Sequence, residues 1–326
     1  MPEQNDTCPN DACRHHAKRV LARSLWIYRR PAHRTMLPIQ LRANGLTFSA
    51  LSLGTGDRLV LLLHGFPDNC RSMIPLGRHL AAAGYRVVAP AMRGYWPSDV
   101  PANDDYSLRA LAADVHGLVR ELSDQPAIVV GHDWGAAAAY AAAAQYPKSV
   151  AACVAMSTPP NAALPGALLR VPQQAVASSY MVEMAWRNAV EEELLADDGA
   201  LIERIWRRWS PDWEPDRARL DDVIRTFQKG STARSARRYY RDILPFPNVR
   251  HWMKSTYTPT RKTIQVPTLI FAGDKDQCML PALYTDCLRH IDAPAELVML
   301  KGVGHFIPLE APEQVASIIL SFLSRL

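Results

Sequence analysis

An aspartate stands at the centre of a glycine-flanked turn, in the sequence Gly131-His132-Asp133-Trp134-Gly135. The apolar run Ala127–Val130 precedes the turn, and an alanine-rich segment, Ala136–Ala144, follows it. This order predicts a strand, a sharp turn and a helix, in which a strained backbone and a close approach of strand and helix require glycine. Such a turn presents its central side chain, usually a serine, at the top of a sheet. A carboxylate nucleophile in that position favours attack on a saturated carbon rather than on an ester carbonyl.

A nucleophilic acid also needs a base and a group that orients the base. His305 lies just after the predicted strand Ala295–Leu300 and is the candidate base. The orienting acid is expected in the loop after the predicted strand Thr268–Ala272, which offers Asp274 and Asp276. The chain order of nucleophile, acid and base is the one used by hydrolases that have a nucleophile elbow.

Two backbone N–H groups are candidates for stabilising an oxyanion. The turn His64-Gly65-Phe66-Pro67 follows the apolar run Leu59–Leu63, and its Phe66 would supply one N–H group. Trp134, the residue after the nucleophile, would supply the other. Each of these motifs, taken alone, is also compatible with an ordinary turn or a solvated loop. Their joint occurrence in the correct order predicts a catalytic triad.

Short apolar strands alternate with helical segments along most of the chain. This alternation predicts a mostly parallel sheet that helices cover on both faces. The predicted strands are Leu46–Leu53, Leu59–Leu63, Arg86–Ala89, Ala127–Val130, Val150–Met156, Thr268–Ala272 and Ala295–Leu300, and the predicted helices are Met73–Ala83, Leu108–Leu122, Pro281–His290 and Pro312–Leu323.

The alternation stops between the predicted strands Val150–Met156 and Thr268–Ala272, where tryptophans, arginines and prolines accompany helical periods. We interpret residues 159–262 as a helical lid (cap) over the strand ends, where open α/β sheets bind their ligands. Residues 37–158 and 263–326 would then form the core. Residues 1–36 are polar and rich in arginine, and we expect them to be a partly disordered N-terminal extension.

Composition excludes several other classes of protein. The net charge of +5 comes from 37 basic and 32 acidic residues spread along the chain, so no nucleic-acid partner is expected. No apolar run reaches the roughly 18 residues of a transmembrane segment.

The six cysteines are too sparse for a disulfide framework, which favours a reducing, cytoplasmic location. Cys8, Cys13, His15 and His16 match no zinc-site spacing, so no metal is expected. The oligomeric state is left open, with a homodimer as one option.

From Leu37 to the C-terminus, the chain resembles an epoxide hydrolase of the α/β-hydrolase superfamily. The resemblance rests on the motif His64–Pro67, on Arg93-Gly94-Tyr95 followed by Ser98-Asp99, and on Gly131–Gly135; Trp96 and Pro97 depart from the usual second motif. It implies an α/β-hydrolase fold, with a mostly parallel sheet flanked by helices and an inserted helical lid. It also implies that Asp276, rather than Asp274, orients His305.

The resemblance further implies two lid tyrosines that hold and protonate the epoxide oxygen. Tyr180 matches the first, and Tyr240, which directly precedes an arginine, matches the second better than Tyr239 does. The implied reaction is hydrolysis of a small apolar epoxide to a vicinal diol. An ester forms on Asp133, and His305 activates water to hydrolyse it. No cofactor is implied.

Two other functions remain as alternatives. A haloalkane dehalogenase would share the aspartate nucleophile, but it holds the departing halide with N–H donors. Trp134 could supply one such donor, whereas Phe66 has no side-chain donor at the position where dehalogenases often have asparagine. A non-catalytic receptor for small molecules would be expected to lack a triad member, and none is missing here. A serine esterase is excluded because no serine occupies an elbow.

Overall fold

The structure is a computed structural model that describes residues 36–244, 249–254 and 262–326. The cysteine and histidine cluster near the N-terminus and the predicted extension, apart from its last residue, lie outside the described residues. The division into an extension, a core and a lid therefore stays a prediction.

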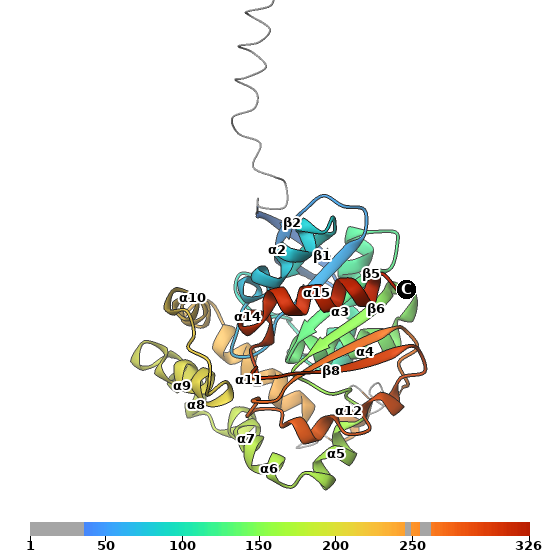
Figure 1. Cartoon of the computed structure of the whole chain (residues 1–326). Coiled ribbons are helices and arrows are strands. Elements are labelled where there is room, and N and C mark those ends of the chain that lie inside the picture. Colours follow the sequence, from blue (N-terminus) through green and yellow to red (C-terminus); the bar gives the residue numbers. More distant parts are fainter. Residues whose placement is uncertain (1–35, 245–248, 255–261) are drawn as a thin grey trace, which may run out of the picture.

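An eight-stranded sheet forms the centre of the molecule (Figure 1). Its strand order is β1-β2-β4-β3-β5-β6-β7-β8, with antiparallel pairing at β1–β2 and β2–β4 and parallel pairing elsewhere. The sheet confirms the predicted α/β-hydrolase architecture. The strands are β1 Leu37–Ala43, β2 Leu46–Leu53, β3 Leu59–Leu63, β4 Arg86–Pro90, β5 Ala127–His132, β6 Val150–Met156, β7 Thr268–Gly273 and β8 Ala295–Leu300.

Helices cover both faces of the sheet, which is why strand β3 is an uninterrupted apolar run. Successive residues of a strand point to opposite faces. Accordingly, Val60 and Leu62 pack into one hydrophobic cluster, together with α2 (Ile74–Ala82) and α15 (Pro312–Leu323). Leu61 and Leu63 pack into the other cluster, together with α3 (Leu108–Leu122) and α4 (Trp134–Gln145).

The segment between β6 and β7 is helical, as the sequence indicated. Figure 1 shows its helices gathered on the side of the molecule away from β1 and β2. Helix α11 contacts both α7 and α8. We call these elements the cap helices; they are α5 Leu164–Arg170, α6 Gln173–Ala177, α7 Ser179–Trp186, α8 Ala189–Leu195, α9 Ala200–Trp209, α10 Arg217–Phe227, α11 Thr232–Ile243 and α12 Val249–Trp252.

Two elements differ from the sequence-based expectation. Strand β1 was not predicted, yet it pairs with β2 along its whole length at the edge of the sheet. The prediction of a continuous helix over Pro281–His290 is wrong. The segment forms two short 3-10 helices, Pro281–Tyr284 and Cys287–His290. Between them Asp286 has φ 60°, a left-handed conformation that interrupts a right-handed helix.

Candidate active site

The predicted elbow lies between the end of β5 and the start of α4. Asp133 has φ 52° and ψ −115°, a conformation that few non-glycine residues adopt. A Cβ atom on Gly131 would overlap the carbonyl oxygen of Gly135, and one on Gly135 would overlap that of Leu63. The two glycines therefore let β5, α4 and β3 approach closely enough to form the turn, and the strained turn presents the side chain of Asp133.

The carboxylate of Asp133 is nearly buried and has two different surroundings. Its Oδ1 accepts a hydrogen bond of 2.8 Å from the backbone N–H of Phe66. Its Oδ2 lies 3.7 Å from Nε2 of His305. Trp134 is the first residue of α4, and the first N–H groups of a helix have no acceptor within the helix. One carboxylate oxygen thus already lies at the Phe66 amide, while the other faces the histidine.

His305 and Asp276 form the second half of the cluster. The Nδ1 atom of His305 lies 2.9 Å from Oδ2 of Asp276. The other oxygen of Asp276 accepts hydrogen bonds from the backbone N–H groups of Cys278 and Met279, at 2.7 and 2.9 Å. Asp274 accepts a hydrogen bond from Gly302 instead. These bonds fix Asp276 in an orientation that holds the Nδ1–H group of His305.

The pKa of His305 reflects two opposing influences. Burial lowers the pKa, but the negative charges of Asp276 and Asp133 and the hydrogen bond to Asp276 raise it to about 10. Neutralising either carboxylate would remove one of the influences that raise this pKa. Formation of an ester on Asp133 would therefore lower the pKa of His305. The neutral imidazole could then accept a proton at Nε2.

A cavity of about 600 Å³ opens beside Asp133 and is enclosed mainly by the cap helices. Most of its surface is apolar, as expected of a site for a small organic molecule. Its lining includes Leu108, Asp133, Trp134, Asn161, Leu164, Leu168, Tyr180, Met181, Val182, Tyr240, Leu244 and Trp252.

Tyr180 and Tyr240 both line this cavity, and their ring centroids are 5.6 Å apart. The hydroxyl group of Tyr240 is buried, and its proton has no acceptor among the described residues. The hydroxyl of Tyr180 lies 3.5 Å from the sulfur of Cys278. Burial and nearby negative charge raise the pKa of both phenols well above the usual value, so both keep their protons at neutral pH.

Tyr239, the alternative to Tyr240, is engaged elsewhere. Its hydroxyl donates a hydrogen bond of 2.9 Å to the backbone carbonyl of Arg93. Its ring packs against Tyr95 and Tyr106, within the core between α11 and the sheet. Tyr239 does not line the cavity, so the geometry places Tyr240 at the site.

Comparison with known proteins identifies the family of the chain. The family model for the alpha/beta hydrolase fold matches residues 58–312. Epoxide hydrolase A of Mycobacterium tuberculosis is 31% identical to the chain, over 87% of this chain and 96% of the relative. The chain belongs to the epoxide hydrolase family of the α/β-hydrolase fold. Epoxide hydrolase 3 of Mus musculus is 29% identical, over 88% of this chain and 76% of its own length.

A solved structure of the family has the same fold over most of the chain. Epoxide Hydrolase A from Mycobacterium thermoresistibile aligns with a TM-score of 0.76 and 27% identity, covering 89% of this chain and 98% of its own. Within the residues that the structure describes, no group of three or more His, Cys, Asp or Glu side chains could hold a metal ion. In the same part of the chain, no helix is long and apolar enough to cross a membrane.

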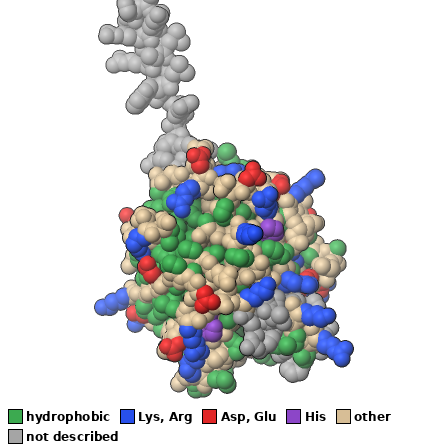
Figure 2. All heavy atoms as spheres, turned by 90° about the vertical axis from the view of Figure 1, so that its right-hand side faces the viewer, with side chains coloured by type: hydrophobic (Ala, Val, Ile, Leu, Met, Phe, Trp, Pro, Cys, Tyr) green, Lys and Arg blue, Asp and Glu red, His purple; other side chains and the backbone are tan. Residues whose placement is uncertain are grey.

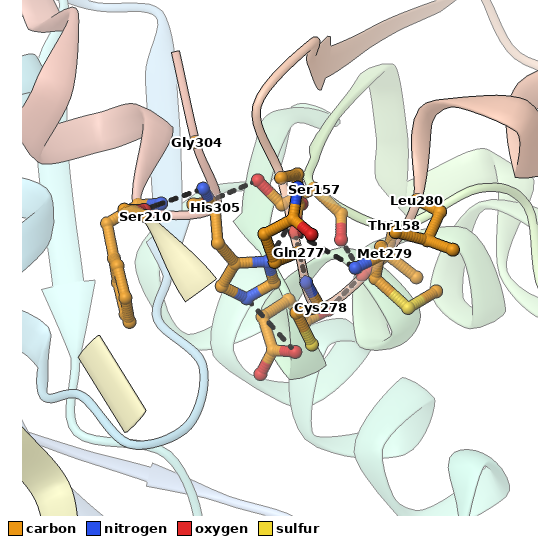
Figure 3. Close-up of polar contacts among 12 residues, drawn as sticks. Ser157, Thr158, Ser210, Gln277, Cys278, Met279, Leu280, Gly304 and His305 are labelled. Carbon is orange, nitrogen blue, oxygen red and sulfur yellow. Dashed lines mark hydrogen bonds and ion pairs between the residues drawn. The ribbon is translucent and has the colours of Figure 1, made fainter. Parts of the chain in front are cut away.

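In this member of the epoxide hydrolase family, sequence reasoning missed the residues that hold the backbone of His305. Figure 3 shows His305 between Ser210 on one side and the segment Gln277–Leu280 on the other. The N–H of His305 donates to Oγ of Ser210 at 2.8 Å, and that hydroxyl donates to Glu310. Ser210 ends α9, 95 positions earlier in the chain. Only the fold reveals this contact.

The carbonyl oxygen of His305 is held as well. It accepts hydrogen bonds from the hydroxyl of Ser157 and from Nε2 of His132. Burial, together with the charge of His305, lowers the pKa of His132 to about 3, so His132 stays neutral and keeps one N–H for this bond. His132 precedes Asp133 in the elbow motif, which is the one sequence signal that could have drawn attention to it.

Proposed function

We propose that the protein hydrolyses the epoxide group of an apolar molecule to a vicinal diol, through a covalent ester on Asp133. One observation carries the proposal: the buried Tyr240 hydroxyl, whose proton has no acceptor among the described residues, lines the same cavity as Asp133. An epoxide oxygen can accept that proton, and it must be protonated as its C–O bond breaks. A halide departs as a stable anion and needs no proton.

In the first step, Oδ2 of Asp133 attacks an epoxide carbon. The new C–O bond forms as the electron pair of the breaking C–O bond moves to the epoxide oxygen. Tyr240, assisted by Tyr180, donates a hydrogen bond to that oxygen and then its proton. The product is a hydroxyalkyl ester, which divides one difficult displacement into two easier steps.

In the second step, His305 accepts a proton from water, and the resulting hydroxide attacks Cγ of Asp133. Ester formation has by then removed the negative charge of Asp133, which otherwise raises the pKa of His305. His305 therefore gives up the proton that it holds in the free protein, the Tyr240 phenolate regains one, and Nε2 of His305 is free to act as the base. The oxyanion develops on Oδ1, the atom that already accepts the Phe66 N–H. Phe66 and Trp134 would stabilise it, and removing one such donor costs roughly 2.7–4 kcal/mol in other enzymes. Collapse releases the diol and restores the carboxylate.

The cap helices would act as a lid in this reaction. They supply both tyrosines and most of the apolar cavity wall. An apolar enclosure favours a small apolar epoxide as substrate and limits the access of bulk water. The mechanism needs no metal or cofactor, because the charges that develop fall on groups that the chain itself positions.

A panel of aromatic and aliphatic epoxides tests the activity, with diol formation as the expected result. A single turnover in ¹⁸O water then tests the mechanism. We expect the label to enter the carboxylate of Asp133 and to leave with the diol of the next turnover. Asp133→Asn should lower kcat at least about a thousandfold, the scale seen when a triad member is removed. Asp274→Asn is the matched control, because the carboxylate of Asp274 accepts a hydrogen bond from Gly302 and, among the described residues, from no other group.

Two results would contradict the proposal. Release of chloride or bromide from haloalkanes without any epoxide turnover would favour the dehalogenase. Label that appears in the diol but never in the protein after the first turnover would mean that Asp133 does not form an ester.

A further inference from the structure

Exposed apolar side chains lie in the wall of the cavity and on the cap helices that form this wall. Leu168 and Val182 line the cavity and are also 42% and 52% exposed. Leu169 and Val176, on the neighbouring turns of α5 and α6, are 87% and 70% exposed. An exposed cluster of large apolar side chains is a common sign of an interaction surface. We call this set the mouth patch; it consists of Leu168, Leu169, Val176, Val182, Val249 and Met253.

Two arginines without carboxylate partners stand beside the mouth patch. A Cβ atom on Gly166 would lie 3.3 Å from a guanidinium nitrogen of Arg170 and 3.7 Å from one of Arg289, so the two positive groups are close together. Neither arginine forms an ion pair with any described residue. Among the described residues, Arg170 donates a hydrogen bond only to the backbone carbonyl of Thr285. Two like charges placed together in this way favour an anionic partner.

The segments that carry the mouth patch are poor in acidic residues, apart from Glu183, which follows Val182 and forms an ion pair with Arg187. Residues 159–182, 243–244 and 249–254 hold no Asp or Glu, but they include the exposed cations Arg170, Arg250 and Lys254. Several other arginines of the cap do form ion pairs, as Arg187 does with Glu193 and Arg207 with Glu214. Figure 2 keeps the vertical direction of Figure 1, and toward the lower end, where α5, α6 and α12 lie, it shows Lys and Arg side chains beside hydrophobic ones, together with some Asp or Glu side chains.

An apolar surface bordered by cations fits the boundary of an anionic lipid bilayer. Apolar side chains enter the region between headgroups and acyl chains, while lysine and arginine bind the anionic headgroups. The position of the mouth patch beside the cavity favours a bilayer over a protein as the partner. A protein seated over Leu168 and Val182 would cover the opening of the cavity, whereas a bilayer would place that opening against the phase in which apolar molecules dissolve.

We propose that the mouth patch, together with Arg170 and Arg289, docks the protein on bilayers that contain anionic lipids. Docking itself does not depend on the reaction. Its consequence, that apolar epoxides pass from the acyl region into the cavity, rests on the function proposed above.

Sedimentation of the full-length protein with vesicles tests the docking. We expect binding to phosphatidylcholine vesicles in which a third of the lipid is phosphatidylglycerol, and much weaker binding to pure phosphatidylcholine. Each cation near an anionic surface contributes about 1 kcal/mol, so Arg170→Glu with Arg289→Glu should reduce the partition coefficient at least about tenfold. Binding should also weaken in 1 M salt, where the Debye length falls from about 10 Å at 0.1 M to about 3 Å.

Matched variants control for charge and hydrophobicity. Arg120→Glu with Arg225→Glu makes the same change in net charge at exposed positions on α3 and α10 and should leave binding unchanged. Leu169→Ser should weaken binding, whereas Leu195→Ser, at a 41% exposed position on α8, should not. Circular dichroism and turnover of a water-soluble epoxide without vesicles show that each variant is folded.

The proposal fails if the protein does not sediment with anionic vesicles. It also fails if Arg170→Glu with Arg289→Glu binds as well as the wild type, because another surface must then be responsible. An equal loss of vesicle binding in both double variants would indicate that net charge alone drives binding. That result would overturn the assigned surface. A protein that binds vesicles as expected but hydrolyses no epoxide would contradict the proposed function and leave docking supported.

Discussion

Tyr239 and Tyr240 are adjacent on α11 but have different surroundings, because consecutive residues of a helix point about 100° apart. The hydroxyl of Tyr239 bonds to the backbone of Arg93 in the interior. The hydroxyl of Tyr240 lies at the cavity, and its ring packs edge-on against Trp134 and Phe66. One phenol is therefore placed to stabilise the fold, and its neighbour to act on a ligand beside Asp133.

This difference predicts opposite effects of two matched substitutions. Tyr240→Phe removes a proton donor, so we expect kcat for epoxide opening to fall roughly 10- to 100-fold while Tyr180 still assists. Tyr239→Phe removes a buried hydrogen bond, so we expect the free energy of unfolding to fall by about 1 kcal/mol with kcat nearly unchanged. Steady-state kinetics and urea unfolding measure the two effects. If kcat fell in Tyr239→Phe and not in Tyr240→Phe, the assignment of the donor would be reversed.

At the scale of elements, the site depends on how closely its turns approach one another. A Cβ atom on Gly65 would overlap the side chain of Asp133, because the turn after β3 passes directly over the elbow. The same closeness lets the N–H of Phe66 reach Oδ1 of Asp133. Gly65 is thus required for the close contact between the Phe66 turn and Asp133, and not only for a tight turn.

We therefore predict that Gly65→Ala displaces the carboxylate or the Phe66 turn. Overpacking of this kind typically costs about 1–3 kcal/mol of stability. A displacement of about 1 Å at a reacting group can reduce the rate about a hundredfold, so kcat should fall by at least that much. Gly166→Ala, in helix α5, is the control. Its Cβ would meet only the ends of two flexible side chains, those of Arg170 and Arg289. Retention of full activity in Gly65→Ala would show that the turn is free to move.

The sequence located the elements that chain neighbours define, and it missed those that depend on distant contacts. The elbow and the His64–Pro67 turn are contiguous motifs, and strands β3 to β8 are apolar enough to be recognised. Strand β1 was missed because most of its residues face solvent at the sheet edge. Ser210 and Ser157 were missed because the fold alone brings them to His305. The choice of Tyr240 came from family resemblance, since its surroundings are set by packing against the sheet.

At the scale of the whole molecule, buried titratable groups link the stability of the fold to pH. Burial lowers the pKa of His64 to about 4 and, together with the charge of His305, that of His132 to about 3. Burial also raises the pKa of Asp68 to about 7. His305 differs from the other histidines, because its two carboxylate partners overcome the effect of burial and raise its pKa to about 10.

These pKa shifts predict that the free energy of unfolding is largest near pH 6.5, the ordinary pKa of histidine. Below it, the unfolded chain protonates His64 and His132 while the folded protein does not, so stability falls as pH falls. Above it, the unfolded chain releases the proton of His305 while the folded protein retains it. The stabilisation from His305 is complete below pH 6.5 and is lost as pH rises toward about 10. Asp68 adds to this loss of stability up to about pH 7, because the folded state favours the protonated form of its carboxyl group.

Urea unfolding from about pH 5 to about pH 10 measures this dependence, and His305→Gln isolates the alkaline side. The difference in unfolding free energy between the wild type and His305→Gln should shrink steadily above pH 6.5, since the substituted side chain carries no proton to lose. His79→Gln, at an exposed position on α2, should leave the pH dependence of the wild type intact. A constant difference across the alkaline range would mean that His305 is neutral in the free protein. Asp133 would then face an uncharged base before it attacks the substrate.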